Sequence, residues 1–311
     1  MTKETNDKTN LQLAWFLLIL LSIVWGASYV LIKMALHDNS GSVRLKPDEL
    51  GAARMFIASL VLLPFFFKFV KTIKRKHVLF LIIAGVCGNG LPAFLFAYAQ
   101  MNLDSAITGM LNSVVPIFAI TISALIFSFR IKWNHLVGIA IGILGAFLIV
   151  FSKLQNVTLT QDEVLPFVLV LLATLCYAIS LNVIKYKLPD LKPMTITSTS
   201  FLFAGFPSLI YLIIIGFPKH VVSNQGALEG VGYVAILAVV GTAVAVYLFN
   251  HLIQISSPVF ASSVTYFIPA VATLLGFLIG EELSYFQLAG MIVLIGGVLL
   301  INRKARVKPV A

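Results

Sequence analysis

Charge is scarce in this sequence. Asp, Glu, Lys and Arg together make up only 11% of its 311 residues, whereas soluble domains carry about 25%. Hydrophobic residues make up 59%, and the mean hydropathy is +1.00. The connections between the apolar runs are short, about a dozen residues at most, so no soluble domain fits between them. A water-soluble fold is therefore excluded, and the chain is expected to lie in a lipid bilayer.

Cysteine and catalytic motifs are also scarce. The two cysteines, Cys87 and Cys176, fall inside apolar runs, say nothing about a disulfide and are expected to be small core residues. No CxxC, HExxH, P-loop or GxSxG motif occurs, so no metal or other cofactor is expected. An intramembrane enzyme is the least favoured alternative, because paired catalytic acids, a metal cluster and an activated nucleophile are all missing from the sequence.

Apolar runs are what the chain does have. There are ten, at residues 13–36, 50–70, 78–100, 106–128, 135–152, 164–186, 195–217, 230–253, 258–280 and 286–302. Each is close to the ~20 residues that an α-helix needs to cross a membrane. The first run is too long for a cleaved signal peptide, whose apolar region has about 7–15 residues. We therefore expect an all-α membrane protein with ten transmembrane helices.

The basic residues predict the orientation of these spans. If the N-terminus is cytoplasmic, 16 of the 22 lysines and arginines fall in cytoplasmic segments, as the positive-inside rule requires. Residues 1–12 then form a cytoplasmic tail, of which the polar residues 1–11 are expected to be disordered, and residues 303–311 form a basic cytoplasmic tail. The net charge of +10 follows from this topology, so no nucleic acid is expected as a partner.

One pattern occurs twice along the chain. Leu21–Lys33 aligns with Ala173–Lys185 at a spacing of 152 residues, with Ser28 matching Ser180. Further matched pairs, 153 residues apart, are Gly88 with Gly241 and Pro116 with Pro269. The two halves, residues 13–152 and 164–302, hold five spans each, and an odd number makes the second half enter the membrane from the opposite face. Inverted repeats are typical of secondary transporters; a duplication kept only for packing is the alternative.

Several short motifs, in this order, resemble the EamA family of the drug/metabolite transporter superfamily over residues 12–302. The resemblance implies a ten-helix secondary transporter of a bacterial inner membrane, often an exporter of amino acids or other small metabolites. Phe129 departs from the family pattern, because it stands where the first half should carry an acid. The motifs are Trp25-Gly26-Ala27-Ser28, Ala53-Arg54-Met55-Phe56, Pro116, Pro269, Gly280-Glu281-Glu282-Leu283 and Gln287-Leu288-Ala289-Gly290.

A cavity for a small-molecule substrate is expected between the two halves. Polar and aromatic side chains within spans one, three, four, six, eight and nine are its predicted lining, because they suit a small amphipathic solute; helix packing or an interfacial belt is the alternative. Pro116 and Pro269 are expected to kink spans four and nine as two halves of one gate. The lining residues are Trp25, Ser28, Tyr29, Asn89, Tyr98, Thr108, Asn112, Tyr177, Ser180, Thr242, Asn250 and Tyr266.

Four charged or titratable residues have open roles. Arg54 either anchors span two at the interface, paired with an outer acid such as Asp104, or contacts a substrate carboxylate. His251, the only histidine expected inside a span, either packs or couples transport to an ion. Lys33 and Lys185 could clamp a phosphate, which would favour a sugar-phosphate or nucleotide-type antiporter.

No Asp or Glu lies near the middle of a span, so proton antiport through a buried acid is not expected. The sequence leaves a monomer and a homodimer open.

Small residues let helices approach closely, so the glycines of spans five and ten are predicted to form packing faces. These are Gly138, Gly142, Gly145, Gly290, Gly296 and Gly297.

Overall fold

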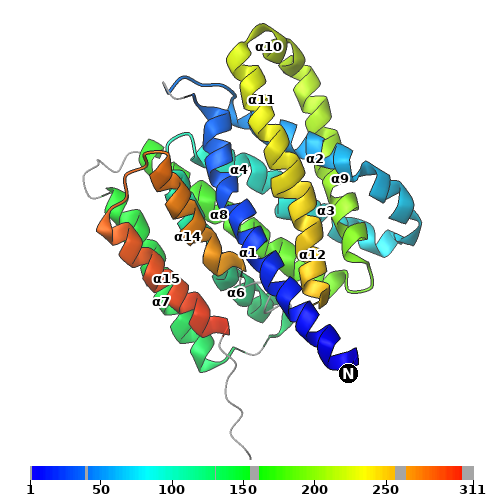
Figure 1. Cartoon of the computed structure of the whole chain (residues 1–311), viewed down its shortest axis with the longest axis vertical. Helices are drawn as coiled ribbons and strands as arrows, with labels where there is room; N and C mark the ends of the chain where they lie inside the picture. Colours follow the sequence, from blue (N-terminus) through cyan, green and yellow to red (C-terminus); the bar gives the residue numbers. More distant parts are fainter. Residues whose placement is uncertain (1, 39–40, 130, 155–160, 256–263, 303–311) are drawn as a thin grey trace, which may run out of the picture.

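The computed structural model describes residues 2–38, 41–129, 131–154, 161–255 and 264–302. These residues form a bundle of helices (Figure 1) without a β-strand among them, apart from one isolated bridge between His37 and Val43. The α-helices are α1 (Thr2–Leu36), α2 (Pro47–Phe69), α3 (Arg75–Gly85), α4 (Leu91–Ala99), α5 (Ser105–Asn112), α6 (Val115–Phe127), α7 (Trp133–Leu154), α8 (Gln161–Lys187), α9 (Pro193–Ile214), α10 (Phe217–Ser223), α11 (Gln225–Ala238), α12 (Ala245–Ile255), α14 (Val264–Leu278) and α15 (Tyr285–Asn302). A 3-10 turn, η1 (Val70–Thr72), and two π-helical turns, η2 (Val86–Gly90) and η3 (Val239–Val244), interrupt them.

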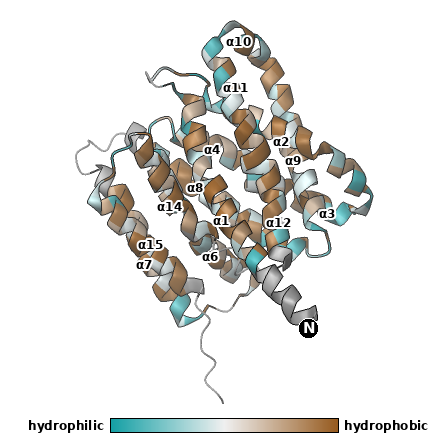
Figure 2. Ribbon diagram, viewed as in Figure 1, coloured by the Kyte–Doolittle hydropathy of each residue, from teal (hydrophilic) through white to brown (hydrophobic). Residues whose placement is uncertain are grey.

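Eight helical segments are long and apolar enough to cross a membrane. Two shorter apolar helices, Phe267–Leu278 and Tyr285–Leu300, lie at the predicted ninth and tenth spans; residues 256–263, where the ninth was predicted to begin, lie outside the described residues. Apolar residues also cover the outside of the bundle (Figure 2), with side chains such as Leu125 and Ile214 exposed by 80% and 76%. Such a surface needs lipid around it, so the chain is a multi-pass membrane protein.

The first helix is longer than predicted. α1 begins at Thr2, so the expectation of a disordered segment at residues 1–11 is wrong for the residues that the structure describes. Nucleation is the unfavourable step of helix formation, whereas adding a residue to an existing helix is not. The apolar part of the span is already helical, so the preceding residues only need to extend it. Residues such as Lys3, Glu4 and Lys8 are good helix formers and extend the helix.

Helices of the first half pack on helices of the second. α1 packs on α14 and on the pair α11 and α12, whereas α8 packs on α6 and on the pair α3 and α4. Span one of the first half thus packs on spans eight and nine, and its equivalent in the second half, span six, packs on spans three and four. α2 lies along α9, and α7 lies along α15 (Figure 1).

Glycines bring α7 and α15 into close contact. A Cβ added to Gly297 would lie 2.5 Å from the backbone nitrogen of Gly142, and one added to Gly290 would lie 2.9 Å from the carbonyl oxygen of Gly145. The predicted packing faces are confirmed at these positions. The prediction is wrong for Gly296, which has no atom within 4 Å of the place of its Cβ, because its position about 100° around the helix from Gly297 turns it away from α7.

Span four is broken, not kinked as predicted. α5 ends at Asn112 and α6 begins at Val115, and the amides of Ser113 and Val114 donate to carbonyls three residues back. Pro116 lies in the first turn of α6, where its missing N–H costs no helical hydrogen bond. Pro269 lies inside α14 as predicted.

Candidate functional site

The two π-helical turns lie at equivalent positions in the halves, since η2 and η3 begin 153 residues apart. Each presents a glycine to a serine of the other half. A Cβ on Gly241 would lie 2.9 Å from Oγ of Ser28, and a Cβ on Gly88 would collide with Oγ of Ser180. The matched serines and glycines of the sequence repeat therefore meet each other, once with Ser28 from the first half and once with Ser180 from the second.

Hydrogen bonds hold both widened turns. The indole Nε1 of Trp25 donates to the carbonyl of Gly241 at 3.1 Å, and Oγ of Ser180 donates to the carbonyl of Ala84 at 3.2 Å. Thr242 donates to the carbonyl of Leu237, five residues back, at 2.9 Å. Single π turns within α-helices recur at functional sites, so these two turns mark the region between the halves as a candidate site.

An arginine–aromatic cluster lies beside the turns. The rings of Tyr29 on α1 and Tyr177 on α8 lie 5.7 and 5.8 Å from the ring of Phe96 on α4, which separates them. Arg54 on α2 interacts electrostatically with both tyrosines, and its Nε donates to Oγ1 of Thr242 at 3.1 Å. Groups from α1, α8 and η3, and so from both halves, thus surround the guanidinium group that α2 carries. Phe96 was not predicted, because it carries no polar atom that would single it out.

The predicted residues of span four are buried at its break. Thr108 is fully buried, and its hydroxyl donates to the carbonyl of Asp104 at 2.9 Å. Asn112 ends α5, and its buried Oδ1 accepts no hydrogen bond from any described residue. Oγ of Ser113 donates to the carbonyl of Thr265 at 3.4 Å, so the break touches α14 near the first of its described residues.

Other predicted residues lie elsewhere or cannot be placed. Tyr98 is 46% exposed and lies near Asp48, and its assignment to the lining stays a prediction. Asn89 lies partly buried within η2, and His251 lies partly buried on α12. The side chains of Asn250 and Tyr266 lie outside the described residues.

Two other histidines are buried within candidate spans, so the expectation of His251 alone is wrong. His77 and His135 are 2% and 7% exposed and lie in the first turns of α3 and α7. Each Nδ1 accepts the backbone N–H of a lysine three residues earlier, at 3.1 Å. Both residues therefore cap helix starts, where backbone donors lack partners within the helix.

An ionic cluster around the buried carboxylate of Glu281 joins the ends of α1, α5 and α14. Nζ of Lys33 lies 2.9 Å from Oε1 of Glu281 and 3.2 Å from Oδ1 of Asp104. Glu281 also accepts the N–H groups of Ser105 and Ala106 at 2.9 and 3.0 Å, which satisfies the start of α5. One role left open for Arg54 was an ion pair with an outer acid such as Asp104; among the described residues Asp104 pairs with Lys33 and not with Arg54.

Two glycines place Glu281 at this position. Gly280 ends α14 with φ of +87°, a left-handed conformation, and the N–H of Glu281 returns to the carbonyl of Gly276 at 3.0 Å. A side chain on Gly276 would collide with the carboxylate of Glu281. The Gly280-Glu281 motif marked this position in the sequence. The sequence did not show which groups bind the carboxylate of Glu281.

Similarity to known proteins now identifies the family. The EamA-like transporter family matches residues 12–151 and 165–303. The chain belongs to the EamA-like transporter family. This confirms the resemblance in the sequence to a drug/metabolite transporter.

Relatives of this EamA-like transporter carry transport names. A "Probable amino-acid metabolite efflux pump" of Salmonella typhimurium is 25% identical over 305 residues, covering 94% of this chain and 97% of the relative. The "Uncharacterized inner membrane transporter YedA" of Escherichia coli K12 is 27% identical over 286 residues, 92% and 89% of the two chains. One solved crystal structure shares the fold, with a TM-score of 0.60 at 13% identity over 92% of this chain and 95% of that one.

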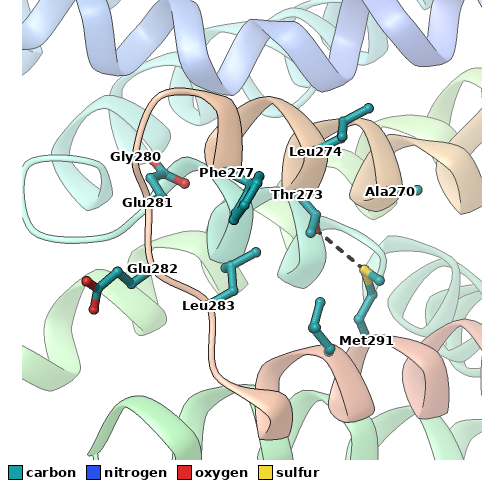
Figure 3. A pocket seen from close by; sticks show the side chains of 10 residues that line it. Ala270, Thr273, Leu274, Phe277, Gly280, Glu281, Glu282, Leu283 and Met291 are labelled. Atoms are coloured by element: carbon teal, nitrogen blue, oxygen red, sulfur yellow. Dashed lines mark hydrogen bonds between the residues drawn. The ribbon is translucent and has the colours of Figure 1, made fainter.

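An open groove of about 860 Å³ runs between α14 and α15 of this EamA-like transporter (Figure 3). Its walls are mostly apolar, from Phe277 and Leu274 to Leu288, and Oγ1 of Thr273 donates to Sδ of Met291 at 3.7 Å across it. None of the predicted lining residues borders it. Within the described residues, no group of three or more His, Cys, Asp or Glu side chains could hold a metal ion.

Proposed function

We propose that this EamA-like transporter exports amino acids or other small amphipathic metabolites across the inner membrane by alternating access. Ten transmembrane helices, arranged as two inverted five-helix repeats, would provide the two states. The paired contacts of Ser28 with Gly241 and Ser180 with Gly88 carry this proposal, because equivalent contacts with the halves exchanged are what a two-fold relation between repeats would give. The name of the Salmonella relative is the reason to begin with amino acids.

The substrate would bind beside the two π-helical turns. Trp25, Tyr29 and Tyr177 would offer it aromatic faces, while Arg54 and the free acceptor of Asn112 would offer polar contacts. Binding sites for small molecules combine mostly apolar walls with a few placed polar groups. This arrangement supports an amphipathic solute.

The two ends of the path would close by different chemistry. With both termini in the cytoplasm, the Lys33–Asp104–Glu281 cluster would hold the outer ends of spans one, four and nine together. At the opposite end, the rings of Phe127 and Tyr186 stack at 4.4 Å between spans four and six, with Lys185 over Tyr186 at 5.0 Å. Opening the outer end would require the ion pairs of this cluster to separate, and breaking ion pairs that are shielded from water costs free energy.

A sugar-phosphate or nucleotide-type antiporter has less support. It would need Lys33, Lys185 or Arg54 to face the cavity. Lys33 is balanced by two carboxylates and Lys185 lies over an aromatic ring, which leaves the single cation of Arg54 for a phosphate. An intramembrane enzyme has no observation in its favour among the described residues.

A resistance screen tests the proposed function. Cells overexpressing the full chain would be exposed to toxic levels of amino acids, amino-acid analogues and common drugs, beside cells expressing an equal amount of a poorly transporting variant. Export predicts protection against one chemical class and higher release of that compound into the medium. Membrane-inserted protein that protects against nothing would contradict the proposal.

A further inference from the structure

We infer that Arg54 binds the carboxylate of the transported solute, which makes the substrates small monocarboxylates, amino acids included. This inference rests on the proposed function and specifies its site. It is carried by the position of Arg54, by the partners around it and by the chemistry of the surrounding wall.

Arg54 lies well inside its span. It is the eighth residue of α2, about 10 Å along the helix axis from Pro47, and it is only partly buried. Its neighbours come from α1, α8 and η3, so it faces the meeting of the two halves. A cation within a membrane span is costly, and such residues face the interior of the bundle and find a counter-charge or serve transport.

The described residues supply no such counter-charge. No ion pair among them includes Arg54. The titratable groups near it are the phenols of Tyr29 and Tyr177, and a phenol carries no charge at neutral pH. The acids nearest in sequence have other partners: Asp48 accepts from Tyr211 at 2.7 Å, and Glu49 lies 2.9 Å from His220. The guanidinium therefore lacks a counter-charge among the described residues, and an anion from outside the protein would supply one.

Carboxylate is the anion that this site fits. Among the described residues, Thr242 bonds Nε of Arg54 and none bonds its two terminal nitrogens, which can bind a carboxylate in the bidentate geometry that arginine favours. One cation among neutral tyrosines matches a monoanion, whereas a phosphate would call for more positive charge. The rings of Phe96 and Trp25 would then lie beside the rest of the solute.

Ligand-dependent thermal unfolding of the purified full chain in detergent tests this inference. Each of the twenty amino acids would be titrated, and every stabilising one would be compared with its amide, which lacks the carboxylate. At least one amino acid should stabilise the wild type. The affinity of the wild type for the amide of that amino acid should be at least about tenfold lower. Arg54→Gln should lower the affinity for that amino acid at least about tenfold, the range expected for a lost charge-assisted hydrogen bond. Arg54→Lys should lower the affinity less, because the charge remains.

Lys68→Gln is the matched control, because it removes a cation from the same helix but from its exposed last turn, outside the cluster. Its affinity for the amino acid should stay within about threefold of wild type. The inference is overturned if no amino acid binds, if amides bind equally well, if Arg54→Gln binds normally, or if Lys68→Gln is as damaging as Arg54→Gln. Should Arg54→Gln fail to fold, Arg54→Lys and the amide comparison still decide. Export of amines by the wild type without carboxylate dependence would sink this inference alone, whereas no export at all would sink the proposed function.

Discussion

The carboxylate of Glu281 joins three segments that are far apart in the sequence. It accepts from Lys33 near the end of α1 and from two backbone N–H groups at the start of α5, and its side chain is only 3% exposed. A buried carboxylate with this many donors stabilises the fold only while all of them are present, because each donor would otherwise lose its partner in a dry environment.

Replacing this carboxylate should destabilise the protein. Glu281→Gln removes the charge opposite Lys33 and should lower the free energy of unfolding by about 2 kcal/mol or more, seen as a lower midpoint of thermal unfolding in detergent. Glu282→Gln is the matched control, since Glu282 is exposed and extends away from α14 (Figure 3). Equal midpoints for the two variants would show that the buried cluster contributes nothing.

A second acid, Asp190, forms an ion pair in the turn between α8 and α9. It accepts from Nζ of Lys76 at 2.8 Å and lies 3.0 Å from Nε2 of His77. The hydrogen bond from Lys76, followed by that from His77, lowers the pKa of Asp190 from 3.8 to about 2. Because the folded pKa is the lower one, the stabilisation is present above about pH 4 and is lost as the pH falls through about 2.

The unfolding midpoints of wild type and Asp190→Asn should follow that pH dependence. Their difference should persist from pH 7 down to pH 5 and shrink as the pH falls from about 4 towards 2. Nδ1 of His77 accepts the N–H of Lys74, so Nε2 carries the proton that faces Asp190 even when the ring is neutral. A difference that vanished between pH 7 and pH 5 would count against this assignment.

At the scale of elements, the π-helical turns depend on glycine. A Cβ on Gly88 would lie 3.1 Å from Cβ of Ser180 and closer still to its hydroxyl, whereas a Cβ on Gly90 in the same turn would lie 3.6 Å from its nearest neighbours. The first position has no room, while the second is an ordinary contact.

Alanine substitutions should separate these two glycines. Gly88→Ala should cost about 1–3 kcal/mol of unfolding free energy by overpacking and should slow export, because it pushes the halves apart at the turn. Gly90→Ala should be close to neutral in both measurements. Adding Ser180→Gly to Gly88→Ala should restore part of the loss, and no recovery would mean that the collision with Ser180 is not its cause.

The break in span four separates α5 from α6 and should permit movement. Pro116→Ala would restore the N–H that can bond to the carbonyl of Asn112 and let one helix run through the break. Export should therefore slow in Pro116→Ala, and likewise in Pro269→Ala, while the folded protein persists. Pro64→Ala is the control, because Pro64 lies inside α2 but is exposed on the outside of the bundle. Unchanged export in both variants would refute the gate.

On the scale of the whole molecule, the parts that follow from local composition were predictable. The apolar runs marked the helices, and the repeated glycines and serines marked positions that do meet across the halves. The family motifs in the sequence pointed to the family that similarity then confirmed.

What could not be predicted depends on long-range geometry. Lys33, Asp104 and Glu281 are separated by 71 and 177 residues, and nothing local joins them. A π turn adds a residue to the helix and rotates everything after it, so the direction of side chains after η2 does not follow from a regular helical period. The break before Pro116 replaced the expected kink because the chain could end one helix and begin another there without losing a helical hydrogen bond at proline.

Alternating access between two halves differs from a channel in one observable way: a carrier exposes its site to one side at a time, so outward movement of unlabelled solute drives inward movement of labelled solute. Proteoliposomes containing the wild-type chain would be loaded with a high concentration of an unlabelled amino acid identified by the resistance screen, and a trace of labelled amino acid would be added outside. A carrier predicts transient accumulation of label inside above its external concentration, saturable by substrate. Label that only equilibrates, or that enters no faster than in protein-free liposomes, would contradict alternating access by this protein.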